Sequence, residues 1–291
     1  MPRTRVRHYF NVACNLIMTH SVKQMIESSP ALISTTSFYT DNFVLTNGGV
    51  LNIYYDLTKE DCDLITNAKR FNQLQFAADK LSDNTLRYIN EKLLPSRQNI
   101  CLSVVINGHG AFNSLDFLSK LPNLKNLAVD LFKNDELEKI NKFLKLETLT
   151  IGAHRTSLKP IIQQTFLKNL FVFAKPKDIE FLGKMSWLDN LTLSMQTLKS
   201  LDFLIPIGNL KELHFILGGT NNLAGLPNIG KIEKLSFMRV RPLMIENLLP
   251  INEMKFLKEL SFDTQAHLTD LNWLKDKTIK TNIINCKSFG R

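Results

Sequence analysis

The chain has 291 residues, of which 44% are hydrophobic and 22% charged, and its formal net charge is +9. This composition excludes a largely disordered chain, and no apolar run is long enough to span a membrane. The excess charge lies at the two ends: residues 1–26 hold four basic residues and no acid, and residues 271–291 hold five basic residues and one acid. A nucleic-acid groove needs its basic residues on the folded body, so this distribution disfavours nucleic acid as a partner.

Residues 1–20 form a basic stretch that we expect to lie outside the fold, with Met18 as a second candidate start. Polar residues interrupt the apolar part of this stretch, and no clear cleavage site follows, so it is a poor signal peptide. The four cysteines are scattered, which favours a reducing compartment over a disulfide framework. We therefore expect the protein in the cytoplasm of the producing cell, or secreted into a host cell without a classical signal peptide.

Residues 21–98 read as degenerate repeats or a cap. The segments "GVLNIYY" from residue 49 and "FNQLQF" from residue 71 have the pattern of strands. Between the second of these and residue 99, "KLSDNTLRYINEKLLP" predicts a helix, for which Ser82 or Asp83 could provide the N-cap.

From residue 99 onward the chain is repetitive. The strand-like "NICLSVVI" is followed by seven similar hexamers with apolar residues at positions one, four and six. They are "LKNLAV" at 124, "LETLTI" at 146, "LKNLFV" at 167, "LDNLTL" at 188, "LKELHF" at 210, "IEKLSF" at 232 and "LKELSF" at 257. Their starts are 21 to 25 residues apart, and "IKTNII" at 279 supplies a last strand. A period of this length is typical of a solenoid.

Within one unit, such as residues 114–129, leucines recur every three residues and then every two. The spacing of three suits a short helical or 3₁₀ turn, and the final step of two indicates a short strand. One unit cannot bury its apolar face alone, so we expect the units to stack with their strands in parallel around a shared core.

Residues 99–284 resemble leucine-rich repeats, close to the short bacterial kind of internalin-like proteins. The resemblance implies an α/β solenoid, with a curved parallel sheet on the concave face and short helical or 3₁₀ turns on the convex face. We divide the chain into the extension (1–20), the cap (21–98) and the repeats (99–291). One departure concerns the ninth position, where the family places an asparagine ladder and this chain has Phe132, His154, Lys175, Gln196, Gly218, Val240 and Gln265. Without that ladder, we expect looser turns after the strands.

The second hexamer position carries charges whose sign alternates along the array. Its occupants are Lys125, Glu147, Lys168, Asp189, Lys211, Glu233 and Lys258. Parallel strands lie about 4.8 Å apart, so each charge has neighbours of opposite sign. We interpret this column as a structural device that favours the correct stacking of the units.

Positions three, five and seven are predicted to face the concave surface, where large apolar side chains gather near the middle of the array. The predicted partner-binding residues are Phe171, Phe173, His214, Ile216 and Met238, framed by Asn169, Glu212, Lys234 and Arg239. Apolar groups exposed together mark a contact surface. The alternative is a local slip of the face assignment, or a loop that covers these side chains.

Scattered histidines and cysteines, and glycines that lie in turn-like contexts, give no catalytic, cofactor or metal motif. We therefore expect a monomeric, non-enzymatic module that binds another protein, as a bacterial effector with a virulence role that engages a host protein. Two alternatives stay open. One is an immunity or antitoxin-type protein that neutralises a toxin, and the other is binding of nucleic acid or an anionic surface through the basic termini.

Overall fold

The computed structural model describes residues 22–27, 30–68, 71–77, 80–106, 114–131, 136–143, 145–152, 157–173, 175–287 and 289. The chain folds into two compact units, residues 1–144 and 145–291. The extension predicted over residues 1–20 lies outside the described residues, and the predicted domain bounds stay predictions.

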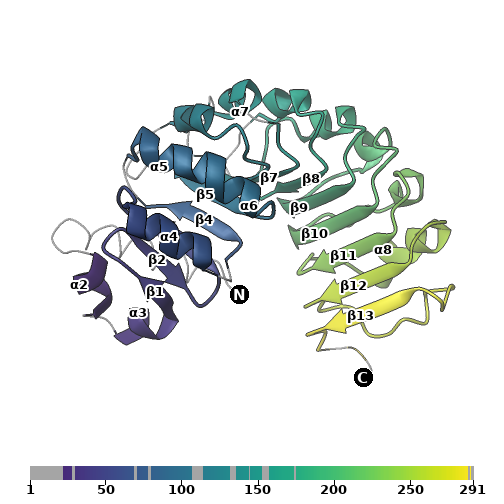
Figure 1. The fold of residues 1–291 in the computed structure, drawn as a ribbon. Coiled ribbons are helices and arrows are strands. Elements are labelled where there is room, and N and C mark those ends of the chain that lie inside the picture. Colours follow the sequence, from purple (N-terminus) through teal and green to yellow (C-terminus); the bar gives the residue numbers. More distant parts are fainter. Residues whose placement is uncertain are drawn as a thin grey trace. The chain divides into compact units, whose positions relative to one another are not determined.

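Unit 1, residues 1–144, combines a mixed sheet with helices between its strands (Figure 1). Its strands are β1 (Thr36–Tyr39), β2 (Phe43–Thr46), β3 (Val50–Ile53), β4 (Gln73–Phe76), β5 (Cys101–Ile106) and β6 (Asn126–Leu131). Its helices are α2 (Val22–Glu27), α3 (Pro30–Thr35), α4 (Lys59–Asn67), α5 (Asp83–Tyr88), the π-helical η1 (Ile89–Leu93), α6 (Leu94–Ser96), the 3₁₀ segment η2 (Leu115–Lys120) and α7 (Leu137–Phe143).

The parallel part of this sheet consists of β3, β4, β5 and β6, each paired with the next. These are the strands predicted from "GVLNIYY", "FNQLQF", "NICLSVVI" and the first hexamer, and the prediction is confirmed. Ahead of them, β1 pairs with β2 and β2 with β3 in antiparallel fashion, a feature that the sequence pattern does not indicate.

Side-chain caps fix where two helices of unit 1 begin. The Thr58 hydroxyl accepts a hydrogen bond from the Asp61 N–H, and the Asp61 carboxylate accepts one from the Thr58 N–H, so α4 starts with a reciprocal capping box. The Ser82 hydroxyl accepts a hydrogen bond of 3.3 Å from the Thr85 N–H at the start of α5. Of the two caps predicted for this helix, Ser82 is the one that acts.

Unit 2, residues 145–291, repeats a strand followed by a short helical segment, and the segments lie on one side of the strands (Figure 1). Its strands are β7 (Thr148–Ile151), β8 (Asn169–Val172), β9 (Asn190–Gln196), β10 (Glu212–Gly218), β11 (Lys234–Met238), β12 (Glu259–Asp263) and β13 (Lys280–Ile284). Its helical segments are η3 (Lys159–Gln163), η4 (Ile179–Lys184), η5 (Asp202–Leu204), η6 (Leu226–Asn228), α8 (Ile245–Leu248) and η7 (Leu249–Glu253).

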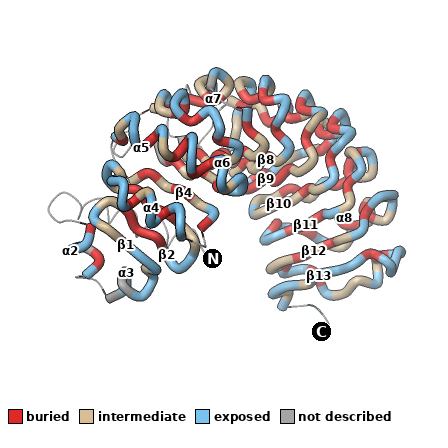
Figure 2. The backbone as a smooth tube through the Cα atoms, in the orientation of Figure 1, coloured by how far each residue is buried: buried red, intermediate tan, exposed pale blue. Residues whose placement is uncertain are grey.

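The strands β7 to β13 pair in chain order, all parallel, and β7 to β12 pair with equivalent hexamer positions side by side. Leu213, for example, pairs with Leu191 on one side and with Leu235 on the other. Positions one, four and six are buried in all seven hexamers, and the alternation along the strands can be followed in Figure 2. The predicted leucine-rich-repeat solenoid is therefore the fold that the chain adopts.

Aromatic rings replace the aliphatic residue at position six in three successive units. The rings of Phe215 and Phe237 stack with centroids 5.4 Å apart, and those of Phe237 and Phe262 with centroids 5.6 Å apart. Trp273 closes the row edge-on against Phe262. Because all three phenylalanines are buried, this stack runs through the core of the C-terminal repeats and ties one unit to the next.

The turns after β9 and β12 are tied by buried glutamines at the ninth position. The Gln265 Nε2 donates to the carbonyls of Phe237 and Asp263, and the Gln196 Nε2 donates to that of Ser194. Both glutamines are buried. In these two units a longer amide side chain satisfies main-chain carbonyls where the family places asparagine, and the expectation of looser turns stays a prediction.

A glycine allows two successive helical segments to approach closely. A Cβ atom on Gly183, within η4, would lie 2.1 Å from the carbonyl oxygen of Phe203 in η5. No real Cβ tolerates such a contact, so only glycine fits here without a shift of the backbone. Gly208, by contrast, has open space around its Cβ position.

Candidate functional site

We call the face of the unit 2 sheet that is turned away from the helical segments the open face. It consists of hexamer positions three, five and seven of β7 to β12, whose side chains alternate with the buried core positions. Each of the nine predicted partner-binding residues is half-buried or exposed, whereas the core residues between them, such as Leu170, Val172 and Phe215, are buried. The structure thus places eight of them at open-face positions, whereas Arg239 is the eighth residue of its unit and lies at the end of β11. The role of all nine in binding stays a prediction.

The apolar members of the set form two groups that flank β9. Phe171 and Phe173 lie at β8, whereas His214 and Ile216 lie on β10 and Met238 lies on β11. The strand between them carries small residues: Thr192, which pairs with Phe171 and His214, and Ser194, which pairs with Ile216.

Thr192 and Ser194 are 3% and 1% exposed although they occupy open-face positions. Their register neighbours are larger, so we infer that those neighbours cover them. The Ser194 hydroxyl is buried and has no hydrogen-bond partner among the described residues. Neither residue is among the nine predicted partner-binding residues. In the sequence, Thr192 and Ser194 are small residues at positions five and seven, where neighbouring units have phenylalanine, histidine and isoleucine. This difference in size is the signal that could have located them.

Position three forms a lateral ladder of polar side chains along the open face. The Asn169 Nδ2 donates to the Thr148 Oγ1 at 3.1 Å, and the Asn190 Nδ2 donates to the Asn169 Oδ1. Further along, the Lys234 Nζ donates to a Glu212 carboxylate oxygen at 2.8 Å. Three of the four residues predicted to frame the site, Asn169, Glu212 and Lys234, are therefore held by neighbouring side chains, which fixes the orientation of their polar groups.

Charges at position two pair as the alternating signs predict. The Lys211 Nζ lies 3.5 Å from the Asp189 Oδ1, and the Lys258 Nζ lies 2.8 Å from the Glu233 Oε2. Both lysines are exposed, so each pair contributes at most about 1 kcal/mol. Their main consequence is that these lysines are already neutralised by a neighbouring carboxylate.

His214 joins β10 and β11 in a polar network. Its Nδ1 lies 2.6 Å from the Ser236 Oγ, and its Nε2 lies 3.6 Å from the Glu212 Oε2. Burial lowers the pKa of His214, although the Glu212 carboxylate opposes this shift. Burial would raise the pKa of Glu212, but its bond to Lys234 and the charges of Lys234 and His214 outweigh burial and lower it.

Ser236, His214 and Glu212 are the residue types of a hydrolytic triad, and His214 lies between the other two. Stabilisation of an acyl-transfer intermediate needs donors aimed at the developing oxyanion. Here the main-chain N–H groups of β10 and β11 are directed at neighbouring strands within the sheet. The network of Ser236, His214 and Glu212 therefore suits a rigid polar contact better than acyl transfer.

Two of the described cysteines, Cys62 and Cys101, are not activated for nucleophilic chemistry. Burial raises the pKa of the Cys101 thiol to about 11, and burial also raises that of Cys62, with help from the neighbouring Asp61 and Asp63. Both thiols are therefore protonated at neutral pH. The described part of the chain also has no cluster of three or more histidine, cysteine or acidic side chains that could hold a metal ion, and no helix long and apolar enough to cross a bilayer.

No family model matches the chain, and no curated protein matches it. Among solved structures, an internalin, InlF, from Listeria monocytogenes is 17% identical with a TM-score of 0.49, covering 84% of this chain and 71% of the internalin. Internalin C2 from the same species is 19% identical with a TM-score of 0.46, covering 70% of this chain and 83% of its own. The chain is thus similar in structure to Listeria internalins over most of its length.

Proposed function

We propose that the chain is a binding module that recognises another protein through the open face of unit 2. The observation that carries this proposal is the presence of four large apolar side chains at open-face positions of a regularly paired sheet, in two groups on either side of β9: Phe171, Phe173 and Ile216 are half-buried and Met238 is exposed. Large apolar groups exposed together are typical of a contact surface, and aromatic and methionine side chains are enriched at interface centres. Stacked repeats commonly provide such extended surfaces.

The mechanism is recognition by a preformed surface. Each strand is held by two neighbours, and the position-three side chains are held by the polar ladder, so little side-chain freedom is lost when a partner docks. The apolar side chains act as anchors, and the network of His214, Ser236 and Glu212 sets the orientation of the partner.

The decisive experiment compares substitutions on the open face with one elsewhere on unit 2. Phe171→Asp and Phe173→Asp together should abolish capture of a partner from a host-cell lysate by the immobilised protein. Phe256→Asp is the matched control, because Phe256 is 49% exposed and lies ahead of β12 rather than on the open face. Equal capture by the wild type and the double variant, with circular dichroism confirming that both fold, would place the contact surface elsewhere.

For the biological role we propose an effector that engages a host protein after delivery into the host cell, with neutralisation of a toxin as the second candidate. The resemblance of the repeats to short bacterial ones supports a bacterial role without separating the two. Co-expression with the products of neighbouring genes tests the second candidate, because an immunity protein should rescue growth from a toxic neighbour. The same experiment with the double phenylalanine variant tests whether the open face is responsible.

A further inference from the structure

We propose that the edge of the sheet where β9, β10 and β11 end is a docking site for an acidic, apolar peptide segment of a partner protein. We name this surface the exit edge and define it by Met195, Leu217, Met238, Arg239 and Arg241. The inference rests on the proposed function and deepens it, because it specifies the chemistry of the partner.

The backbone turns in the same way at the ends of five successive strands. The eighth residue of each unit has a left-handed conformation, with φ of 61° at Met195 and Leu217 and 53° at Arg239, Thr264 and Asn285. Glycine and asparagine adopt this conformation at the lowest free-energy cost, whereas methionine and leucine are poor choices for it. The turn itself therefore does not explain why large apolar side chains stand at the first two positions.

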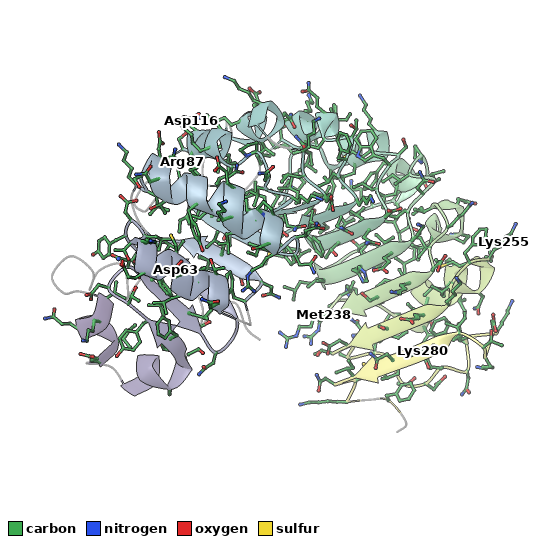
Figure 3. All side chains as sticks on the ribbon, in the orientation of Figure 1. Asp63, Arg87, Asp116, Met238, Lys255 and Lys280 are labelled. Atoms are coloured by element: carbon green, nitrogen blue, oxygen red, sulfur yellow. The ribbon has the colours of Figure 1, made fainter. Side chains whose placement is uncertain are left out.

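The apolar side chains of the exit edge are open to solvent. Met195 is 43% exposed, Leu217 is 36% exposed and Met238 is 39% exposed. Met195 and Leu217 are equivalent eighth residues on adjacent strands, which are spaced about 4.8 Å apart in a sheet, and Met238 lies one position earlier on the next strand, beside Ile216. We call these three exposed side chains the apolar strip. Figure 3 shows Met238 at the end of β11, on the opposite side of unit 2 from Lys255. Two of these exposed apolar side chains, Met195 and Leu217, stand at left-handed positions that disfavour them, which points to a role in binding rather than in stability.

Two guanidinium groups border this strip. Arg239 and Arg241 are exposed, and neither forms an ion pair among the described residues. The Arg241 N–H donates to the Gly218 carbonyl at 2.9 Å, which holds its backbone beside the residue that follows Leu217. The nearby Asp263, the register neighbour of Met238, already accepts hydrogen bonds from Thr264 and Asn285.

Elsewhere in the sheet, several cationic side chains are paired with carboxylates. Three lysines at positions two and three, Lys211, Lys234 and Lys258, pair with carboxylates on neighbouring strands. The exit edge therefore presents cationic groups that the fold itself does not neutralise. Guanidinium groups bind carboxylates with two parallel hydrogen bonds, which makes a carboxylate beside an apolar side chain the complementary ligand.

A peptide satisfies both halves of this surface. Its apolar side chains would cover Met195, Leu217 and Met238, and its carboxylates would pair with Arg239 and Arg241. A single-stranded nucleic acid also carries anionic groups, but its bases need aromatic side chains to stack on, and the exit edge offers methionine and leucine instead. The observations thus favour an acidic peptide.

The test is selection from a phage-displayed library of short random peptides on the immobilised full-length protein. Enriched peptides should combine carboxylates with large apolar residues. A synthetic copy of one of them, followed by fluorescence anisotropy, should bind the double variant Arg239→Glu, Arg241→Glu at least about tenfold more weakly than the wild type. A copy with lysine in place of its acids should regain affinity for that variant. Lys255→Glu is the matched control, since it reverses one exposed charge at the far edge.

Failure of this inference differs from failure of the proposed function. The inference is overturned by an absence of enrichment, by enriched peptides without acidic character, by binding that the arginine variants leave unchanged, or by tighter binding of a single-stranded oligonucleotide probe. None of these outcomes affects partner capture through Phe171 and Phe173. Conversely, peptide binding that depends on the arginines while the phenylalanine variants capture partner normally would retain the exit edge and refute the open face.

Discussion

The imidazole of His214 lies 2.6 Å from the hydroxyl of Ser236, measured from Nδ1 to Oγ, across the boundary between β10 and β11. This contact stands in the middle of the open face, where Glu212 and Lys234 are its charged neighbours. The protonation state of His214 therefore bears both on the stability of two repeats and on the surface that they present.

Protonation of His214 should destabilise the protein. Burial lowers its pKa below the ordinary value of 6.5, so the folded state favours the neutral ring. The stability that this group contributes is present above the ordinary pKa and is lost as the pH falls through the lower folded-state value. Urea unfolding at a series of pH values should show a free energy of unfolding that declines on acidification below about pH 6.5. His214→Gln should flatten that decline, and an identical slope in the variant would contradict the assignment.

The row of stacked rings predicts a large core effect at its centre. Phe237→Ala should lower the free energy of unfolding by about 3–5 kcal/mol, because it removes a buried ring that contacts rings on both sides. Phe166→Ala is the comparison, since Phe166 is 57% exposed and should change stability by no more than about 0.5 kcal/mol. Denaturant unfolding of the two variants measures the difference, and similar losses in both would show that the rings do not act as core.

Gly183 and Gly208 form a matched pair for a test of close packing. Gly183→Ala should cost about 1–3 kcal/mol, because its Cβ would collide with the Phe203 carbonyl. Gly208→Ala meets open space and should be neutral or stabilising by up to about 1 kcal/mol. Thermal and urea unfolding measure both. The interpretation of the contact between η4 and η5 does not survive if the two variants are equally stable.

The buried amide of Gln265 predicts a local loss of protection. Gln265→Ala should leave the carbonyls of Phe237 and Asp263 without this donor and cost about 1–3 kcal/mol. Amide hydrogen exchange should quicken around the turn after β12 more than in β8. The exposed Gln163 supplies the control, because Gln163→Ala should leave exchange and stability unchanged.

The salt dependence of partner binding should distinguish binding through the open face from binding through the basic ends. Binding of a partner through apolar anchors is expected to change little between low and physiological salt, whereas phosphate-driven binding falls steeply. A salt titration of the captured partner, with a single-stranded oligonucleotide alongside, measures this difference. A steep decline that disappears when residues 1–17 are deleted and Lys275, Lys277 and Lys287 are replaced by glutamine, which leaves β13 in place, would favour the anionic-surface alternative.

The repeating part of the fold follows from local sequence. A hexamer with fixed apolar positions determines which side chains enter the core, and hexamers that share this pattern then stack in equivalent register, as the pairing of Leu191, Leu213 and Leu235 shows. The Ser82 cap is equally local. The antiparallel strands β1 and β2 lack this periodicity, and their place in the sheet depends on contacts that no short pattern encodes.

The details of the site depend on neighbours across strands. Thr192 and Ser194 have open-face positions, yet larger side chains on the adjacent strands leave them buried. The conformations of Met195 and Leu217 are set by the strand ends, since their residue types do not favour positive φ. Gln265 replaces an expected asparagine by reaching carbonyls with a longer side chain. None of these features can be read from one repeat alone.

The alternating charges at position two also constrain how the array can change in length. Loss of one repeat between Asp189 and Glu233 would set two acids side by side, whereas loss of two would bring Asp189 against Lys258 and restore an attractive pair. A variant that lacks two of these repeats should therefore keep the alternation of charge, whereas a variant that lacks one should lose it at the new junction. The alternating charges at position two thus favour arrays in which neighbouring repeats carry opposite charges.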